Sequence, residues 1–314
     1  MIMNFAEIYF DLLKRYSDTE SIADITHTAK RMHDIFEQHS RILISYSGGS
    51  DSDCIVHFVC KYFPEHLEKC HFVFCNTGLE YEATKRHIKE TEKRYGIHIV
   101  EVRGKSIPFV VKKYGLPILS KAKSQLINAY CRNVPWAVKY ANGESKSHKF
   151  TLSKRQKELC KYVQEHGILI SDKCCTLSKK QPIKDYIIKH GITLNVTGER
   201  EAEGGIRAMR QHSCYSEKSV CSKFMPLYWW SDRTKQIYKD SEGILFSDCY
   251  EIWGMQRTGC VGCPFNRHYK RDLAVIKKFE PQLFNACLNV FGTAYALTEK
   301  FNANSYGTKL DKIE

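Results

Sequence analysis

Residues Arg41-Ile-Leu-Ile-Ser-Tyr-Ser-Gly-Gly-Ser-Asp-Ser52 join a short apolar run to a turn that is rich in glycine and serine. The apolar run predicts a buried parallel strand, and residues 53–62 predict a helix that Pro64 ends. Gly48 and Gly49 allow positive φ and a close approach of the backbone to a ligand. The helix N-terminus offers unpaired N–H groups and a positive dipole end, so the turn is suited to hold phosphate.

Strand and helix patterns continue to alternate on both sides of this turn. We expect further strands at residues 71–75, 97–102 and 192–197 and a helix at residues 80–95. This alternation predicts an α/β fold with a doubly wound parallel sheet and right-handed crossovers. Ligands of such sheets bind at the carboxyl ends of the strands, where Ser47 and Thr77 lie.

Hydroxyl and carboxylate groups add to the phosphate-binding potential of the turn. Ser47, Ser50 and Ser52 can donate hydroxyl hydrogen bonds, and Asp51 can accept Mg²⁺ or position a water. The Gly-Lys-Ser/Thr pattern of P-loop ATPases is absent, so this is a different phosphate loop. The alternative is a plain tight turn capped by serine. The neighbouring turn at Thr77 and Gly78 favours the phosphate-binding interpretation.

Four cysteines form two close pairs far apart in the sequence, Cys174-Cys175 and Cys260-Val-Gly-Cys263. A Cys-x-x-Cys loop can direct two thiolates at one metal centre. Side chains of consecutive residues normally diverge, so an adjacent pair suits a target of several atoms. The four thiols therefore favour a [4Fe–4S] cluster; a single zinc ion and unligated thiols are the alternatives.

Composition and charge set the class of protein. The chain has 314 residues, 14 cysteines and a formal net charge of +13. Its cysteine content and the lack of a recognisable secretory signal predict a reducing, cytoplasmic setting. No apolar run approaches the ~20 residues of a membrane helix, so no membrane partner is expected. The basic balance indicates either a nucleic-acid partner or a charge that serves solubility.

The phosphate turn resembles the pyrophosphate loop of the adenine-nucleotide α-hydrolase-like superfamily, whose members bind ATP or related adenylyl compounds. The cysteine pattern resembles that of the phosphoadenylyl-sulfate (PAPS) and adenylyl-sulfate (APS) reductase family. In that family a Cys-Cys pair is followed by a Gly-x-Arg segment and then by Cys-x-x-Cys. Here Gly198-Glu-Arg200, with Arg207 further on, looks like the middle segment. The resemblance spans about residues 40–268.

This resemblance implies a set of site residues and partners. The resemblance implies that the chain binds an adenine nucleotide, either ATP or PAPS/APS, and Mg²⁺ is an optional further cofactor. It also implies a thiol or electron-donor protein as a partner. Arg200, Arg207 and Arg210 also have a simpler reading as solvated helix charges. The implied nucleotide-binding residues are Ser47, Gly48, Gly49, Ser50, Asp51, Ser52, Thr77, Gly78, Gly198, Arg200 and Arg207, and the implied cluster ligands are Cys174, Cys175, Cys260 and Cys263.

Two features depart from the reductase pattern. The reductases attack sulfur with a cysteine near the C-terminus, whereas no cysteine follows Cys287, which lies in an apolar helical stretch. The Gly-Gly-Ser-Asp-Ser loop is closer to the ATP-cleaving branch. The catalytic group therefore stays unassigned. An alternative function is ATP-dependent adenylation and sulfur transfer to nucleic acid, as in DNA phosphorothioation or tRNA thiolation, and a third is a non-catalytic nucleotide- or DNA-binding module.

The sequence predicts three regions. Residues 1–40 are expected to form N-terminal helices, and residues 41–220 a nucleotide-binding α/β domain with a basic helical insertion at 104–165. Residues 221–314 are expected to close the cluster and to be helical from about Asp272 onward. The aromatic run 228–230 is expected to pack in the core, with base stacking as the alternative.

Overall fold

The computed structural model describes residues 4–144, 151–204 and 213–301, and the chain divides into two compact units. The first unit comprises Met1–Asn76, Glu82–Val102 and Pro182–Thr258, and the second comprises Thr77–Tyr81, Arg103–Gln181 and Gly259–Glu314. Residues 221–258 thus group with the sheet, whereas the predicted insertion groups with the C-terminal helices. No helix of the described residues is both long and apolar enough to span a membrane.

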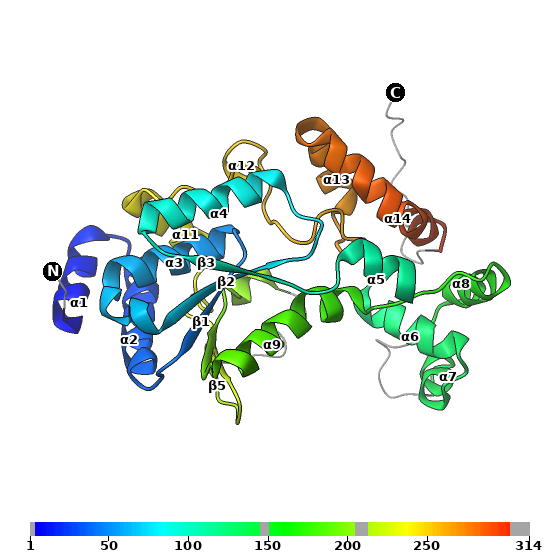
Figure 1. Cartoon of the computed structure of the whole chain (residues 1–314), viewed down its shortest axis with the longest axis horizontal. Helices are drawn as coiled ribbons and strands as arrows, with labels where there is room; N and C mark the ends of the chain where they lie inside the picture. Colours follow the sequence, from blue (N-terminus) through cyan, green and yellow to red (C-terminus); the bar gives the residue numbers. More distant parts are fainter. Residues whose placement is uncertain (1–3, 145–150, 205–212, 302–314) are drawn as a thin grey trace. The chain divides into compact units, whose positions relative to one another are not determined.

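The first unit is built on one six-stranded sheet with the order β3-β2-β1-β4-β6-β5 (Figure 1). β1 is parallel to both β2 and β4, and β4 is parallel to β6. The short edge strand β5 is antiparallel to β6. The strand order reverses between β1 and β4, so the end of β1 lies at a topological switch point. The strands are β1 (Ile42–Tyr46), β2 (Cys70–Asn76), β3 (Ile99–Arg103), β4 (Leu194–Val196), β5 (Tyr215–Ser216) and β6 (Ser222–Phe224).

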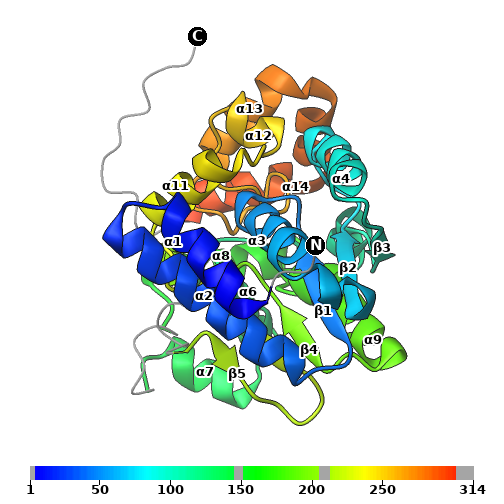
Figure 2. The same cartoon turned by 90° about the vertical axis from the view of Figure 1, so that its left-hand side faces the viewer.

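Both faces of the sheet are covered by helices. Successive apolar side chains of β1 point to opposite faces and pack in different cores. Ile42 and Ile44 of β1 pack in the larger core with α1, α2, α3 and α11, whereas Leu43 packs with α9 on the other face. Figures 1 and 2 show these helices around the sheet. The predicted doubly wound α/β fold is therefore confirmed. The helices are α1 (Phe5–Arg15), α2 (Thr19–Glu37), α3 (Ser50–Tyr62), α4 (Glu82–Tyr95), α9 (Gln181–His190), α11 (Asp232–Glu242) and α12 (Asp248–Glu251), with short 3-10 turns η1 (Pro64–Lys69) and η4 (Glu201–Glu203).

The aromatic run at residues 228–230 explains why the region after β6 belongs to this unit. Tyr228 and Trp230 are fully buried in the larger core, and the Trp230 indole N–H donates to Thr28 Oγ1 at 2.9 Å. Trp229 is 45% exposed. Core packing therefore accounts for two of the three rings.

The second unit is mainly helical. α13 packs on α14, α14 packs on α8, and α6 packs on α7. Helices α5 and α8 precede Cys174 in the sequence, whereas α14 follows Cys263, and α14 contacts both of them. These contacts join the predicted insertion and the C-terminal helices in one unit. Its helices are α5 (Ile107–Tyr114), α6 (Lys121–Cys131), α7 (Pro135–Ala141), α8 (Lys154–Glu165), the π-helical turn η3 (Thr176–Lys180), α13 (Tyr269–Phe279) and α14 (Pro281–Phe301).

A buried ionisable group supports the helix that follows the phosphate loop. Asp53 Oδ1 accepts hydrogen bonds from the Tyr46 hydroxyl at 2.7 Å and from His87 Nε2 at 2.9 Å. Burial acts to lower the pKa of His87, but the hydrogen bond and charge of Asp53 outweigh it and raise that pKa. The pair therefore joins α3 to α4 most strongly when His87 is protonated.

We expect this pair to make stability depend on pH. Because the folded pKa of His87 is raised, its contribution is complete below its unfolded pKa of about 6.5 and is lost as pH rises through the folded pKa. His87→Gln should lower the free energy of unfolding at pH 6 by about 1.5–3 kcal/mol and flatten its fall between pH 6 and 8. Urea unfolding measures this, with the exposed His98→Gln as control. An unchanged pH profile in His87→Gln would show that the pair is neutral.

Candidate functional site

The predicted phosphate loop, residues 47–52, lies at the carboxyl end of β1, at the switch point of the sheet. Gly48 has φ of +66°, and a Cβ there would lie 2.7 Å from Thr84 Cγ2, so both the conformation and the space require glycine. Gly49 is the N-cap of α3. The first-turn N–H groups of α3 follow directly, as the sequence predicts.

Ser52 holds the loop together from inside. Its hydroxyl accepts from the Gly49 N–H at 3.1 Å, donates to the Gly49 carbonyl at 2.7 Å and lies 3.2 Å from Ser47 Oγ. Two of the three predicted hydroxyl donors therefore bond within the loop. These bonds fix the turn in advance of any ligand.

Two cations converge on Asp51. Arg200 Nε lies 2.6 Å from Asp51 Oδ1, and Lys235 Nζ lies 3.2 Å from the same oxygen. Lys235 also donates to Ser50 Oγ at 3.1 Å. Sequence reasoning missed Lys235, because it lies on α11, far from the loop in sequence and outside any local motif.

Arg200 is a buried, fixed cation, which excludes the reading of a solvated helix charge. It is 5% exposed, donates to the Trp230 carbonyl at 3.1 Å and pairs with Asp232 Oδ1 at 2.7 Å. Burial acts to lower its pKa, but the charges and hydrogen bonds of Asp51 and Asp232 outweigh it and raise that pKa. The guanidinium thus stays charged beside the loop.

A tyrosine and a threonine complete the surroundings of the loop. The Tyr250 phenol oxygen accepts from the Ser50 backbone N–H and lies 2.8 Å from Thr258 Oγ1. A Cβ on Gly49 would lie 3.1 Å from this phenol oxygen. Burial is the main cause that raises the pKa of Tyr250, so it stays a neutral hydroxyl. No local sequence pattern predicted this pair, in which Tyr250 lies on the short helix α12 and Thr258 lies beyond it.

The remaining predicted nucleotide residues have different places. A Cβ on Gly198 would lie 3.3 Å from the Ser52 N, so glycine allows the segment after β4 to approach α3. Thr77 and Gly78 follow β2 directly and belong to the second unit, where Glu80 Oε1 accepts from the Thr77 N–H at 3.0 Å. Arg207 and Arg210 lie outside the described residues.

All four predicted cluster cysteines belong to the second unit. Cys174 and Cys175 begin the helix that continues through η3 into α9. Burial raises the pKa of Cys174 to about 12, and charge on Cys175 and Cys260 adds to this. Burial likewise raises the pKa of Cys263 to about 12, with charge on Cys260 as the next cause. Charge on neighbouring thiols thus adds to the effect of burial on the pKa of both Cys174 and Cys263.

The Cys260–Cys263 loop is supported by α14. Gly262 has φ of +59°, the Tyr295 hydroxyl donates to its carbonyl, and the buried Cys287 lies behind it. A Cβ on Gly262 would lie 2.7 Å from Tyr295 Oη and 2.8 Å from Cys287 Sγ. Cys287 therefore packs against the loop, as its apolar helical setting predicts.

We expect Gly262→Ala to disturb this loop. Alanine is strained at this φ, and its methyl group would displace Tyr295 or Cys287. The substitution should therefore lower the free energy of unfolding by about 1–3 kcal/mol. Thermal unfolding measures the change. Gly143→Ala is the matched control, because Gly143 has φ of +82° and open space around its Cα. Equal melting temperatures for the two variants would mean that the contacts behind Gly262 do not constrain the loop.

A mainly parallel, doubly wound sheet with a glycine-rich loop at its switch point defines an α/β protein whose loop lies where ligands of such sheets bind. Residues 41–134 and 137–266 match the phosphoadenosine phosphosulfate reductase domain family. The chain belongs to this family.

Several known proteins are similar to the chain. Two uncharacterized proteins of Methanocaldococcus jannaschii are 24% and 22% identical over 254 and 253 residues. These matches cover 79% and 78% of this chain but 41% and 46% of the relatives, so the chain spans less than half of their length. The adenosine 5'-phosphosulfate reductase of Rhodococcus erythropolis is 32% identical over 92 residues, which cover 29% of this chain and 36% of that protein.

Solved structures give more distant likenesses. The phosphoadenylyl-sulfate reductase of Candida auris, in a phosphate complex, has a TM-score of 0.41 at 13% identity and covers 69% of this chain and 80% of that one. The FMN adenylyltransferase of Candida glabrata, with FAD and inorganic pyrophosphate, has a TM-score of 0.47 at 12% identity and covers 82% and 71%.

Proposed function

We propose that this protein is an enzyme of sulfur metabolism that binds an adenine nucleotide at residues 47–52 and carries a [4Fe–4S] cluster on its four paired cysteines. The observation that carries the nucleotide site is the loop itself. It combines a glycine held at φ of +66° with two cations, Arg200 and Lys235, that meet at Asp51. Family membership supports the nucleotide and the sulfur chemistry.

A polyphosphate would replace contacts that the loop now makes internally. Its oxygens would accept from the first-turn N–H groups of α3, in place of the Tyr250 phenol oxygen that now accepts from Ser50. Lys235 and Arg200, which now form ion pairs with Asp51, would also form ion pairs with the phosphates. Asp51 could then hold Mg²⁺ bound to the same phosphates. Gly198, which approaches α3 beside the loop, would line the same nucleotide site.

The adjacent pair Cys174-Cys175 favours a multi-iron cluster over one zinc ion, because the side chains of consecutive residues normally diverge and suit a target of several atoms. Within the described ranges, no group of three or more Cys, His, Asp or Glu side chains forms a preassembled metal site, so the cluster is a proposal from the cysteine pattern. Cys174, Cys175, Cys260 and Cys263 would hold the cluster, which would supply redox chemistry.

Reduction of activated sulfate is the reaction that the reductase relative supports. Two thiols of a donor would supply two electrons to the sulfur of adenylyl sulfate or its 3'-phosphorylated form. The sulfur–oxygen bond to the nucleotide phosphate breaks, and sulfite, the nucleoside phosphate and a disulfide result. The loop would hold the departing phosphate and stabilise its charge.

Binding measurements on protein purified without oxygen test this proposal. Adenylyl sulfate, its 3'-phosphorylated form and Mg-ATP are each titrated by calorimetry, and sulfite is measured with a dithiol donor. We expect binding of a sulfated nucleotide and sulfite release, with Lys235→Ala weakening binding at least tenfold and the exposed Lys30→Ala leaving it unchanged. Binding of Mg-ATP alone would overturn the reductase reaction, and binding without turnover would overturn the enzyme.

A further inference from the structure

The positive charge of the chain is concentrated in one segment. Residues 103–181 contain 17 Lys and Arg against four Asp and Glu, which equals the whole formal excess of +13. The remaining residues are therefore balanced. A charge serving only solubility would be spread over the surface, whereas a concentrated one creates a field that attracts polyanions.

Part of this charge surrounds two aromatic rings on α5. We call Lys105, Lys113, Lys173, Phe109 and Tyr114 the lysine–aromatic cluster. Lys173 Nζ lies 4.7 Å from the centre of the Tyr114 ring, and Lys105 and Lys113 Nζ lie 5.7 and 5.8 Å from it. The same two lysines lie 6.0 and 5.7 Å from the Phe109 ring. All three lysines are exposed, and Phe109 is 45% exposed.

The cluster lacks internal neutralisation. Within the described part of the chain, none of the three ammonium groups has a carboxylate oxygen within 4 Å, and Lys105 instead donates to the Tyr114 hydroxyl at 3.3 Å. That hydrogen bond, together with the charges of Lys105, Lys113 and Lys173, lowers the pKa of Tyr114. Three like charges gathered in this way repel each other, so an anion that binds here relieves the repulsion.

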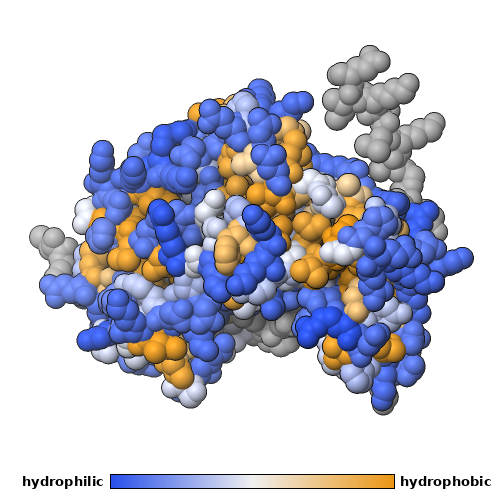
Figure 3. All heavy atoms as spheres, turned by 45° about the vertical axis from the view of Figure 1, so that its right-hand side comes forward, coloured by the Kyte–Doolittle hydropathy of each residue, from blue (hydrophilic) through white to orange (hydrophobic). Residues whose placement is uncertain are grey.

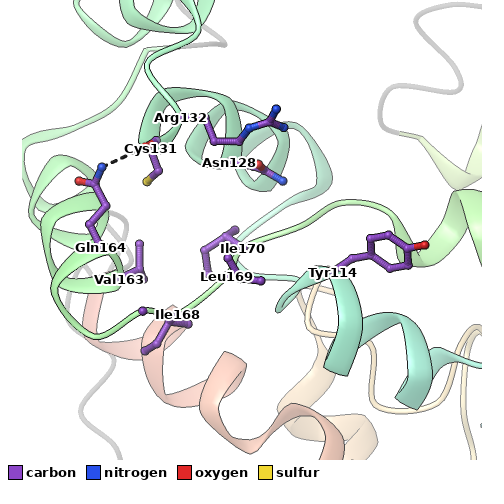
Figure 4. A pocket seen from close by; sticks show the side chains of 10 residues that line it. Tyr114, Asn128, Cys131, Arg132, Val163, Gln164, Ile168, Leu169 and Ile170 are labelled. Atoms are coloured by element: carbon purple, nitrogen blue, oxygen red, sulfur yellow. Dashed lines mark hydrogen bonds between the residues drawn. The ribbon is translucent and has the colours of Figure 1, made fainter.

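A pocket adjoins the cluster through Tyr114. It has a volume of about 260 Å³ and an apolar wall formed by Val163 and residues 168–170 (Figure 4). Asn128, Arg132 and Gln164 contribute polar groups, and Gln164 Nε2 donates to the Cys131 carbonyl at 3.1 Å. Pockets for drug-sized ligands are larger, about 300–1,000 Å³, so one planar heterocycle is a suitable occupant.

We infer that the second unit binds single-stranded nucleic acid along the lysine–aromatic cluster, with one base in the adjoining pocket. Backbone phosphates would contact the three lysines, and unstacked bases would stack on Phe109 and Tyr114. Alternating cations and exposed rings are the arrangement that such strands require. A duplex offers no free base faces to these rings. Figure 3 shows a face of the molecule on which hydrophobic residues lie among hydrophilic ones. Such a mixture alone does not indicate nucleic-acid binding; the proposal depends on the measured contacts between the three lysines and the two rings.

This inference goes beyond the proposed enzyme and does not depend on it. Binding is therefore measured on the full chain without any adenine nucleotide. Fluorescence anisotropy follows mixed-sequence 20-nucleotide RNA, the same sequence as DNA, and the corresponding duplex. We expect both single strands to bind more tightly than the duplex. The ratio of the RNA and DNA affinities then shows which of the two nucleic acids the lysine–aromatic cluster prefers. Tighter binding to the duplex would overturn the inference.

Two sets of variants separate phosphate contact from stacking. Lys105→Ala with Lys113→Ala should reduce the slope of log affinity against log salt by about 1.4, since each single-strand phosphate contact contributes about 0.7. Phe109→Ala should weaken binding about tenfold with an unchanged slope. Lys30→Ala with Lys85→Ala removes equal charge from exposed, paired lysines of the first unit and should change neither value. If all variants bind like the unaltered chain, the surface is excluded.

The pocket and the competing partner have their own readouts. Asn128→Ala should reduce the preference among the four homopolymers, because it removes a group that can bond to a base edge. Vesicles of phosphatidylcholine with and without phosphatidylserine test a lipid surface. Loss of vesicle binding in the double lysine variant, with no nucleic-acid binding by the unaltered chain, would assign the cluster to membranes and overturn the inference.

Discussion

Replacement of Cys263 by serine is expected to remove the iron and the brown colour of protein purified without oxygen. All four thiols must lose protons to bind a cluster, and a serine hydroxyl does so far less readily than a thiol. Burial already raises the pKa of Cys263 to about 12, so cluster formation should also be promoted by rising pH. Iron content and visible absorption measure the loss, which we expect to be nearly complete.

Cys221→Ser provides the matched control for this variant. Cys221 is also half-buried, but it belongs to the first unit, and its thiol donates to the Ser222 carbonyl. We expect it to keep full iron content and colour. Iron retained by Cys263→Ser, or a colourless native protein that contains one zinc per chain, would refute the cluster.

The second large effect is expected from Gly48→Ala, which should weaken nucleotide binding by at least tenfold. Left-handed backbone strain costs an alanine about 1–2 kcal/mol, and its methyl group would approach Thr84 Cγ2 to 2.7 Å. The loop must shift to relieve this contact, which would misdirect the N–H groups that we propose to bind the phosphates. A loss of 1.4 kcal/mol in binding free energy corresponds to tenfold.

Gly96→Ala separates strain from position. Gly96 has φ of +62°, close to that of Gly48, but nothing lies within 4 Å of an added Cβ. Both variants should therefore carry similar backbone strain, and only Gly48→Ala should lose nucleotide affinity in calorimetric titrations. Normal binding by a folded Gly48→Ala protein would show that the nucleotide binds elsewhere.

Local sequence patterns predicted the sheet because they depend on neighbours along the chain. The apolar run before Gly48 predicted β1 directly, and the helix predicted at residues 53–62 begins three residues earlier, at Ser50. The doubly wound topology followed from alternation alone and was confirmed. The four cysteines of the two motifs belong to one unit, and their role as cluster ligands stays a prediction.

Long-range partners could not be predicted in the same way. Lys235 reaches Asp51 from α11, and Tyr250 reaches the Ser50 N–H from the short helix α12. Neither residue has a local pattern that distinguishes it from any surface lysine or core tyrosine. The grouping of residues 221–258 with the sheet depends on the burial of Tyr228 and Trp230, which composition alone does not specify.

The chain passes between the two units five times, at residues 76/77, 81/82, 102/103, 181/182 and 258/259. No single cut can therefore release either unit as an intact fragment. A truncation after residue 258 would leave the Cys174-Cys175 pair without its distant partners, although the sheet would keep every strand. Each unit consists of three separate segments of the chain. Recombination between relatives, natural or engineered, must therefore replace all three segments of a unit at once to transfer that unit intact.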